Sequence, residues 1–367
     1  MIIVSINIKK LELPKEFHLK TKKEMAPINI AVIGCGYWGP NLIRNFNTIT
    51  NCRMKVCCDI NTNRLKKMKQ LYHDIEITSD YKEILASNEI DAVAIATPVR
   101  THAEIAANCL KTNKHILVEK PVTSSVKECE ELISLSKERN KIFMVGHTFE
   151  YTASVNKIRE IIESEELGDI LYIASNRLNL GLFQDDINVV WDLAPHDISI
   201  LLYLLKKMPI SVNAQGKAHY KKGIEDVAWV SLNFNNNLIA FLHHSWLDPY
   251  KIRKMTVVGS KKMLIYDDVE PNEKIKIFDK GIQVPPYYDT FAEFHFTYRY
   301  GDIYSPRVEE YEPLTKECQH FIHCIQKNQQ PISDGYDGLK VISILEATTE
   351  SLKNSGKSVL IKLPDAV

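Results

Sequence analysis

Residues 28–39 constrain the fold of this chain more than any other stretch. The run Ile28–Ile33 is apolar, mostly β-branched and uncharged, which favours a strand buried on both faces of a parallel sheet. It leads into G-C-G-Y-W-G at 34–39, where the glycines have the spacing G-x-G-x-x-G. Apolar residues then recur at helical spacing, at Leu42, Ile43 and Phe46. Strand, glycine turn and helix in this order predict a dinucleotide-binding βαβ unit.

Each glycine of this turn has a separate physical task. We expect Gly34 to make the tight turn, Gly36 to let a diphosphate approach the backbone, and Gly39 to let helix and strand pack closely. The phosphates would lie at the N-terminus of the helix, where backbone N–H groups are free. Tyr37 and Trp38 are predicted to be turn residues that face the cofactor.

An acidic residue follows the next apolar run at the distance expected for a ribose contact. Residues 53–58 form a second predicted strand, and Asp59 comes directly after it, about 20 residues beyond the glycine turn. A carboxylate there accepts the ribose hydroxyls and repels a 2′-phosphate, which predicts NAD rather than NADP. Arg64 is expected to be solvated.

Size and composition narrow the class of protein. At 367 residues the chain is long enough for two domains. The 46 lysines and arginines balance 46 aspartates and glutamates, so no overall field attracts nucleic acid or an anionic membrane. The eight cysteines include no C-x-x-C pair, which indicates reduced thiols in a cytoplasmic protein. No apolar stretch is long enough to span a bilayer.

The order of predicted elements divides the chain into three parts. Residues 1–27 are expected to be an N-terminal extension, and a natural start at Met25 is one hypothesis for it. Alternating strands and helices over 28–148 predict an NAD-binding Rossmann domain. Over 149–367 we expect an α+β substrate and oligomerisation domain, because its strands, mainly between 211 and 278, are separated by turns and indicate a large, mostly antiparallel sheet. The aromatic-rich segment 285–306 is assigned to sheet and interface packing, with a sugar site as the alternative.

Lys120 is the first candidate for acid–base chemistry. It follows the predicted strand 115–118 and precedes Pro121, at the sheet edge where ligands of α/β proteins bind. An ammonium at this edge can stabilise the alkoxide that develops from a substrate hydroxyl. The alternative is a surface lysine paired with Glu119.

Asp192 and His196 form the second candidate. They are four residues apart in a predicted helix over 192–205, so their side chains share a face. A carboxylate beside an imidazole favours the imidazolium and orients the ring. The alternative is that Asp192 caps the helix and His196 is structural.

Metal catalysis is a competing interpretation with weaker support. His243 and His244 are adjacent in a predicted strand, so they point to opposite faces. His320, His323 and Cys324 share a helix face with spacing that ligands can have, but a surface or core patch explains them as well. We expect no metal.

Five blocks of the sequence share one pattern with a known family. They are Gly34–Gly39, Ala96-Thr97-Pro98 with His102, Glu119-Lys120-Pro121, Gly146-His147, and Trp191-Asp192 to His196. Together they resemble the Gfo/Idh/MocA (glucose-fructose oxidoreductase / inositol dehydrogenase) family. The resemblance extends from residue 28 to about 360, and E-K-P at this distance after the glycine turn is characteristic of the family.

The resemblance implies roles for these residues and a fold. Lys120 and His196 would be the catalytic pair, and Asp192 would bind substrate and orient the pair. Thr97, Pro98, His102 and Glu119 would belong to the cofactor pocket. The implied fold is an α/β Rossmann domain followed by an α+β domain whose large open sheet mediates homodimers or homotetramers.

Within the family, G-Y-W-G-P-N and W-D-L-A-P-H-D are most similar to members encoded with bacterial surface-polysaccharide genes. Members that resemble UDP-N-acetylglucosaminuronate 3-dehydrogenase oxidise the sugar 3-hydroxyl. This chain departs from several relatives at Glu150, where they have a basic residue. Arg177 or Arg299 would then contact an anionic sugar, with Asn179 as a further substrate contact.

Three other functions fit the same residues. The substrate could be an inositol, another polyol or a hexose instead of a nucleotide sugar. The fold also serves lyases or hydrolases that bind and recycle NAD. A cofactor-binding regulator without turnover is the third, and the presence of Lys120, Asp192 and His196 together argues against it.

Overall fold

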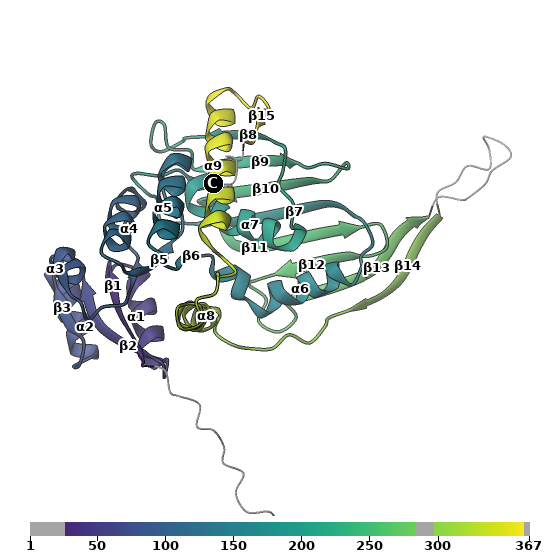
Figure 1. Ribbon diagram of the computed structural model, residues 1–367. Coiled ribbons are helices and arrows are strands. Elements are labelled where there is room, and N and C mark those ends of the chain that lie inside the picture. Colours follow the sequence, from purple (N-terminus) through teal and green to yellow (C-terminus); the bar gives the residue numbers. More distant parts are fainter. Residues whose placement is uncertain (1–25, 284–296, 363–367) are drawn as a thin grey trace, which may run out of the picture.

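The computed structural model describes residues 26–283 and 297–362, which form two sheets with helices packed on and between them (Figure 1). The first sheet has six parallel strands in the order β3-β2-β1-β4-β5-β6. Their bounds are β1 Ile28–Ile33, β2 Cys52–Cys58, β3 Glu76–Thr78, β4 Ala92–Ile95, β5 His115–Glu119 and β6 Phe143–Gly146. This order is that of a Rossmann domain.

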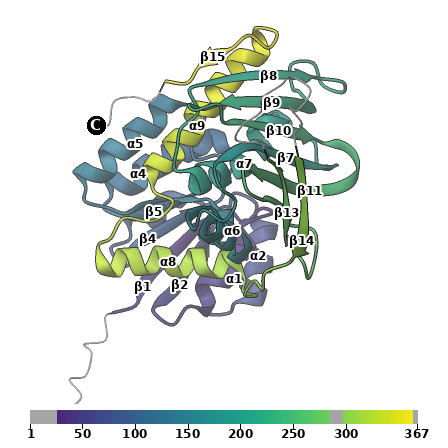
Figure 2. The ribbon, with the colours of Figure 1, turned by 90° about the vertical axis from the view of Figure 1, so that its right-hand side faces the viewer.

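Helices cover the first sheet on two sides, as a parallel sheet requires. The connecting helices are α1 Gly39–Thr48, α2 Thr62–Leu71, α3 Tyr81–Ala86, α4 His102–Lys111 and α5 Val126–Glu138, with a 3-10 turn η1 at Val99–Thr101. Two helices from the end of the chain return to this half of the molecule: α8 (Pro313–Lys327) packs on α1, and α9 (Gly335–Lys353) packs on α5. Figure 2 shows α8 beside α1.

The second sheet has nine strands in the order β14-β13-β12-β11-β7-β10-β9-β8-β15. Their bounds are β7 Ile170–Leu180, β8 Ser211–Lys217, β9 Val227–Asn233, β10 Ile239–Ser245, β11 Leu247–Gly259, β12 Met263–Asp267, β13 Ile275–Gln283, β14 Thr297–Tyr304 and β15 Val359–Leu360. Neighbouring strands are antiparallel except β7 and β10, which are parallel. The predicted fold class is therefore confirmed, with one parallel pair that the sequence did not indicate.

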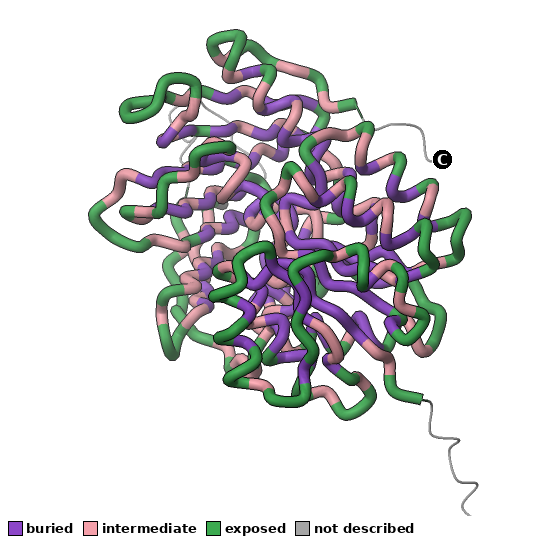
Figure 3. The backbone as a smooth tube through the Cα atoms, turned by 90° about the vertical axis from the view of Figure 1, so that its left-hand side faces the viewer, coloured by how far each residue is buried: buried purple, intermediate pink, exposed green. Residues whose placement is uncertain are grey.

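The two faces of the second sheet differ. Its inner face carries α7 (Val189–Leu205) and α9, and α6 (Ala153–Glu163) packs on α7. Its outer face exposes large side chains, with Trp229, Phe241 and Tyr172 being 55%, 48% and 40% exposed. Buried residues accordingly follow the first sheet and the inner face of the second, as the purple segments of Figure 3 show.

Helix α7 begins earlier than the sequence indicates. Its first residue is Val189, and the Asn188 side chain accepts a hydrogen bond from the backbone N–H of Trp191 at 3.1 Å. Asn188 is therefore the cap, and Asp192 lies inside the helix. Pro195 interrupts the helix hydrogen bonding, because it cannot donate to the carbonyl of Trp191.

Some expectations fall on residues outside the described ranges. These are the extension over residues 1–25 and the aromatic residues Tyr287, Tyr288, Phe291, Phe294 and Phe296. The remaining tyrosines of that segment, Tyr298, Tyr300 and Tyr304, lie on β14 and are exposed.

Candidate active site

The glycine turn between β1 and α1 has the geometry of a dinucleotide cradle. Gly34 has φ +99°, and a Cβ there would lie 2.5 Å from the carbonyl oxygen of Ala96. A Cβ on Gly39 would lie 1.8 Å from the carbonyl oxygen of Gly34, so only glycine allows this packing of helix on strand. Around Gly36, in contrast, the nearest heavy atom is 3.8 Å from an added Cβ. The backbone is open at Gly36, and the residues present fit a dinucleotide diphosphate.

Asp59 lies beside this turn with its carboxylate held in place. Its Oδ2 accepts the Cys35 backbone N–H at 2.7 Å and its Oδ1 accepts that of Asn61 at 2.7 Å. The Arg64 guanidinium lies 3.5 Å from Asp59 Oδ2. The Arg64 side chain is 51% exposed, so it is solvated as expected, and it also pairs with Asp59.

The two aromatic residues of the turn have different surroundings. Tyr37 is 88% exposed and lies on the open side of the turn. Trp38 precedes α1 and is half-buried, and its Nε1 is a buried atom next to the Glu119 carboxyl. The cofactor-facing role predicted for both residues stays a prediction.

His102 braces two loops at the cofactor edge. The ring is buried, with Nδ1 2.9 Å from the carbonyl oxygen of Pro121 and Nε2 2.7 Å from that of Thr97. Both ring nitrogens face backbone carbonyls, so His102 braces these two loops, and the cofactor contact expected for it stays a prediction. It positions Thr97 and Pro98, which leave β4 at the carboxyl edge of the sheet.

Glu119 is buried and lies near a second carboxyl group. Its Oε2 accepts the Lys120 backbone N–H at 3.3 Å, and its Oε1 has no partner in the described residues. Burial raises the pKa of Glu119 to about 7. Glu317 of α8 is fully buried and accepts the Thr148 hydroxyl at 2.7 Å, and its pKa is raised by burial and by Glu119. Sequence reasoning missed Glu317, because nothing in α8 indicates which face meets the first sheet.

Lys120 connects the first sheet to α7. Its Nζ donates to the backbone carbonyl of Asp192 at 2.9 Å and lies 3.7 Å from the Asp192 Oδ1. Burial lowers the pKa of Lys120, while Asp192 and Glu119 oppose that shift. The alternative of a surface lysine paired with Glu119 is wrong, since the ammonium is turned to α7.

Asp192 does not act on His196 in the expected way. Its Oδ2 accepts the indole N–H of Trp246 at 3.0 Å, and its other oxygen faces Lys120. The pKa of His196 is well below its usual range, first because of burial and then because of the charges of Lys120 and Arg177. The expectation that Asp192 favours the imidazolium is therefore wrong, and the neutral imidazole is the stable form. Trp246 lies between β10 and β11, in a position that no sequence motif marks.

The ring of His196 packs against Phe149 of the 3-10 turn η2, Thr148–Tyr151. The ring centroids are 5.2 Å apart with an interplanar angle of 71°. His147, which precedes the turn, is buried, and burial together with the charge of Lys120 lowers its pKa to about 3. The structure thus places Lys120, Asp192 and His196 together at the carboxyl end of β5, and adds His147.

The predicted substrate contacts are placed less favourably. Arg177 is buried and its guanidinium pairs with Asp197 at 3.0 Å, so it is not free to bind an anionic sugar. Arg299 pairs with Asp279 on β13. Glu150 is also buried, so it does not face a substrate. Asn179 near the end of β7 is partly exposed.

The histidines weighed as metal ligands have other partners. His243 stacks on Trp229 at 4.3 Å, and His244 bonds to Asp197 at 2.9 Å. His320 Nε2 lies 3.4 Å from the Cys324 Sγ and accepts the backbone N–H of Ile332. Within residues 26–283 and 297–362, no three His, Cys, Asp or Glu side chains are placed to share a metal ion.

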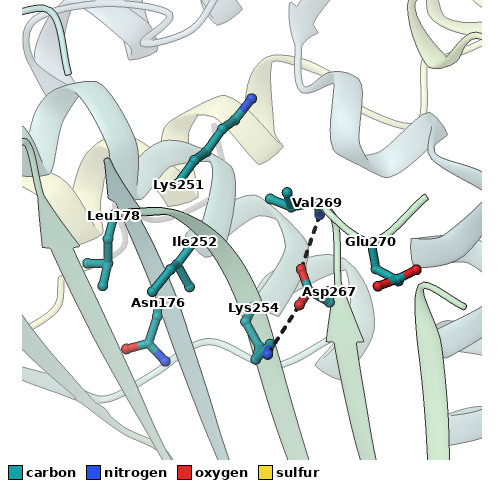
Figure 4. Close-up of a pocket in the computed structure, with 8 residues that line it drawn as sticks. All are labelled: Asn176, Leu178, Lys251, Ile252, Lys254, Asp267, Val269 and Glu270. Carbon is teal, nitrogen blue, oxygen red and sulfur yellow. Dashed lines mark hydrogen bonds and ion pairs between the residues drawn. The ribbon is translucent and has the colours of Figure 1, made fainter. Parts of the chain in front are cut away.

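A hollow of about 500 Å³ opens away from these residues, on the outer face of the second sheet (Figure 4). Two of its charged groups pair with each other, with Lys254 Nζ 3.2 Å from the Asp267 carboxylate. Asn176 and Lys254 are cross-strand partners whose side chains point away from the inner face that carries α7. The hollow therefore does not belong to the Lys120 site.

The helices in the described residues are too short or too polar to cross a membrane.

Comparison with known proteins agrees with this geometry. The model of the oxidoreductase family with an NAD-binding Rossmann fold matches residues 28–147, and that of the GFO/IDH/MocA C-terminal domain matches residues 155–265. A structure described as GenD2 from gentamicin A biosynthesis in complex with NAD superposes with a TM-score of 0.78 at 18% identity, covering 96% of this chain and all of that one.

Three relatives are named for different activities. Myo-inositol 2-dehydrogenase of Thermotoga maritima is 24% identical over 89% of this chain and 96% of its own. UDP-N-acetylglucosamine 3-dehydrogenase of Acidithiobacillus ferrooxidans is 26% identical over 70% and 76%. The 2,7-anhydro-N-acetylneuraminate hydratase of Escherichia coli is 25% identical over 68% and 70%.

The two family models together cover most of the chain, and the glycine cradle with Asp59 fits the cofactor that the first model names. The predicted cofactor, NAD, is confirmed. The chain belongs to the Gfo/Idh/MocA family of NAD-binding oxidoreductases.

Proposed function

We propose that this oxidoreductase is a dehydrogenase that oxidises a secondary hydroxyl of a nucleotide sugar, at C3, in the synthesis of surface-polysaccharide precursors. The observation that carries the proposal is the meeting of Lys120, Asp192 and His196 at the carboxyl edge of the first sheet. That edge is where a bound dinucleotide presents its reactive end in open α/β sheets.

The described side chains supply what hydroxyl oxidation needs. The neutral imidazole of His196 accepts the hydroxyl proton, because its pKa is held below the usual range. The Lys120 ammonium, fixed by Asp192, stabilises the negative charge that develops on the substrate oxygen. NAD, when bound, supplies the acceptor for the hydride. The opposite assignment, with Lys120 as base, is the alternative that its lowered pKa supports.

The substrate class rests on similarity to a relative. The 26% identity to UDP-N-acetylglucosamine 3-dehydrogenase supports a nucleotide sugar oxidised at C3. Because Arg177 and Arg299 are paired with Asp197 and Asp279, the sugar diphosphate would meet other groups. Arg253 is also paired, with Asp268, but its side chain is 39% exposed and its charge acts on His196, so it is the cation that we assign to that contact.

Absorbance at the NADH band tests this proposal. The enzyme with NAD is mixed with UDP-N-acetylglucosamine, UDP-glucose, myo-inositol or glucose, and the initial rates are compared. We expect NADH to form fastest with a nucleotide sugar. Arg253→Met should raise KM for that sugar and leave KM for NAD unchanged, and a panel without any NADH formation would contradict the proposal.

A second candidate function uses the same fold for a different reaction or a different substrate. Similarity to an inositol dehydrogenase and to a hydratase supports a polyol or hexose dehydrogenase, or a lyase or hydrolase that recycles NAD. Thermal shift with the same panel in the presence of NAD identifies a ligand even without net NADH, because a ligand of the folded state raises its stability. A stabilising sugar that is converted without NADH supports the recycling enzyme.

We also propose that the enzyme is a cytoplasmic homodimer or homotetramer formed through the outer face of the second sheet. The exposed Trp229, Phe241 and Tyr172 support an interface, because monomers rarely leave large apolar side chains together in water. Light scattering of wild type and Trp229→Lys checks the assembly. A wild-type monomer would contradict it.

A further inference from the structure

A cluster of charged and polar side chains lies directly beside His196, on the sheet side of α7. Its centre is Asp197, the next residue along the helix. Asp197 Oδ2 accepts Arg177 Nε–H at 3.0 Å and His244 Nε2–H at 2.9 Å. Its Oδ1 accepts Arg177 Nη2–H and the Ser175 hydroxyl, both at 3.0 Å. Four hydrogen bonds thus satisfy one carboxylate.

The whole cluster is removed from solvent. Asp197, Arg177 and His244 are 2%, 6% and 0% exposed. The pKa of Asp197 is lowered below its usual range, because Arg177 and His244 outweigh the effect of burial, so the carboxylate is charged. A buried ion pair gives little stability compared with apolar residues of the same size. Its effect is therefore on geometry more than on stability.

The cluster joins three elements at fixed angles. Ser175 and Arg177 lie on β7, His244 is the partner of Arg177 on β10, and Asp197 lies on α7. Apolar contacts alone let a helix slide or rotate on a sheet at small cost, whereas four hydrogen bonds to one carboxylate define its position. His196 is one residue away, so the bonds also define where its side chain leaves the helix.

A second contact runs from the cluster to the imidazole ring. The Arg177 guanidinium lies over the ring of Phe149, 4.8 Å from its centroid. Phe149 also contacts the ring of His196, with 5.2 Å between the ring centroids. Phe149 is thus held by a cation and packs in turn against the imidazole.

We propose that Asp197, Arg177 and His244 are positioning residues for His196, fixing α7 on the sheet and, through Phe149, the orientation of the imidazole. This inference rests on the proposed role of His196 as base. It assigns to Arg177 a role different from the substrate contact that the sequence predicts.

The charges around His196 predict how the pKa of its imidazole should change in each variant. Arg177 lowers the pKa of His196, so its removal raises that pKa, while loss of Asp197 leaves Arg177 without a counter-charge and lowers it. The other charged or titratable groups facing His196 stay in place in both variants. They are Lys120 after β5, His147 after β6, Asp192 on α7, and Arg253 on β11 with its partner Asp268.

The test compares Arg177→Met, Asp197→Asn and the double variant by two measurements. One is the NMR titration of the His196 imidazole, assigned by its absence in His196→Asn. The other is the pH profile of kcat/KM for NADH formation. We expect the His196 titration and the acidic limb to move to higher pH in R177M, to lower pH in D197N, and to stay near wild type in the double variant.

A conservative substitution of Arg177 separates the effect of its geometry from the effect of its charge. Arg177→Lys keeps the cation but cannot reach both carboxylate oxygens in the same way. It should leave the titration near wild type and lower kcat about tenfold or more, because small misplacements of reacting groups are costly. If the His196 titration shifts in the same direction in Arg177→Met and Asp197→Asn, or shifts in neither, the proposal is overturned.

A control variant tests whether a loss of stability alone, without any change beside His196, alters the titration. Ser351 is a buried residue of α9 that donates to the Lys357 carbonyl and accepts from the Ala214 backbone N–H, and neither partner belongs to the Asp197 cluster. Ser351→Ala should lower Tm and leave the titration unchanged, and a shift there would also overturn the proposal. The NMR readout needs no turnover, so a failure of the proposed dehydrogenase activity is seen separately, as absence of NADH in the wild type.

Discussion

The Lys120 ammonium lies 2.9 Å from the backbone carbonyl oxygen of Asp192 and 3.7 Å from its carboxylate. This contact joins the carboxyl end of β5 to the first turns of α7. The helix that carries His196 therefore also holds the side chain of Lys120 in place. The proposed catalytic pair, Lys120 and His196, is thereby assembled across the junction of the two sheets.

Loss of either Lys120 or His196 should lower the rate of the chemical step much more than it weakens the binding of NAD. We expect Lys120→Met and His196→Asn to lower kcat by about 10²- to 10⁴-fold, the usual contribution of a positioned acid or base. The dissociation constant for NAD, measured by fluorescence titration, should change little. Lys114→Met is the matched control, because Lys114 is also buried and donates to the carbonyls of Ser87 and Ile90. A similar loss of kcat in that control would contradict the assignment.

Trp246 should matter through Asp192. Trp246→Phe keeps the aromatic ring but removes the N–H that donates to Asp192 Oδ2 at 3.0 Å. The freed carboxylate no longer fixes Lys120, so we expect kcat/KM for the sugar to fall about tenfold, equivalent to about 1.4 kcal/mol. Steady-state kinetics with NAD saturating measures it. Unchanged kinetics with a lowered Tm would show that the bond is structural only.

Cofactor preference should depend on Asp59. Asp59→Asn removes the negative charge that repels a 2′-phosphate, and it leaves Arg64, now 3.5 Å away, without its ion-pair partner. The ratio of kcat/KM for NADP to that for NAD should therefore rise. In the double variant Asp59→Asn/Arg64→Ala, the gain for NADP should be smaller. An equal gain in both variants would show that Arg64 does not reach the ribose.

The buried carboxyl of Glu317 should make stability depend on pH. Burial raises its pKa above the unfolded value, so the folded state holds a proton that the unfolded state releases as pH rises. This contribution to stability is present at low pH and is lost as pH rises through the raised pKa. Glu317→Gln does not titrate, so its Tm relative to wild type should be higher at pH 8 than at pH 5. Thermal unfolding at both pH values checks this, and a constant difference would contradict it.

The parts that the sequence predicted are those that local patterns define. Gly34 and Gly39 are recognisable because a tight turn and a helix–strand contact each exclude a Cβ, and Gly36 because a diphosphate is expected to approach its backbone. Lys120 is recognisable because the end of a parallel strand is a local property. The alternation of strand and helix gave the first sheet in the same way.

The parts that it missed depend on contacts between distant segments. Arg177 and Asp197 are 20 residues apart in the chain, and their pairing follows from how α7 lies on β7. The pKa of His196 falls because burial and neighbouring cations outweigh Asp192, which the four-residue spacing does not indicate. Glu317 reaches Thr148 only because α8 returns to the first sheet.

Transfer of an isotopic label tests the central claim most directly. UDP-N-acetylglucosamine with deuterium at C3 is incubated with NAD and enzyme, and the reduced cofactor is analysed by mass spectrometry and NMR. Direct hydride transfer at the Lys120 and His196 site predicts that deuterium appears in NADH with wild type and that its rate of appearance falls by orders of magnitude in His196→Asn. Unlabelled NADH would place the oxidised carbon elsewhere, and wild-type and variant enzymes that transfer label at the same rate would contradict the assignment of the site.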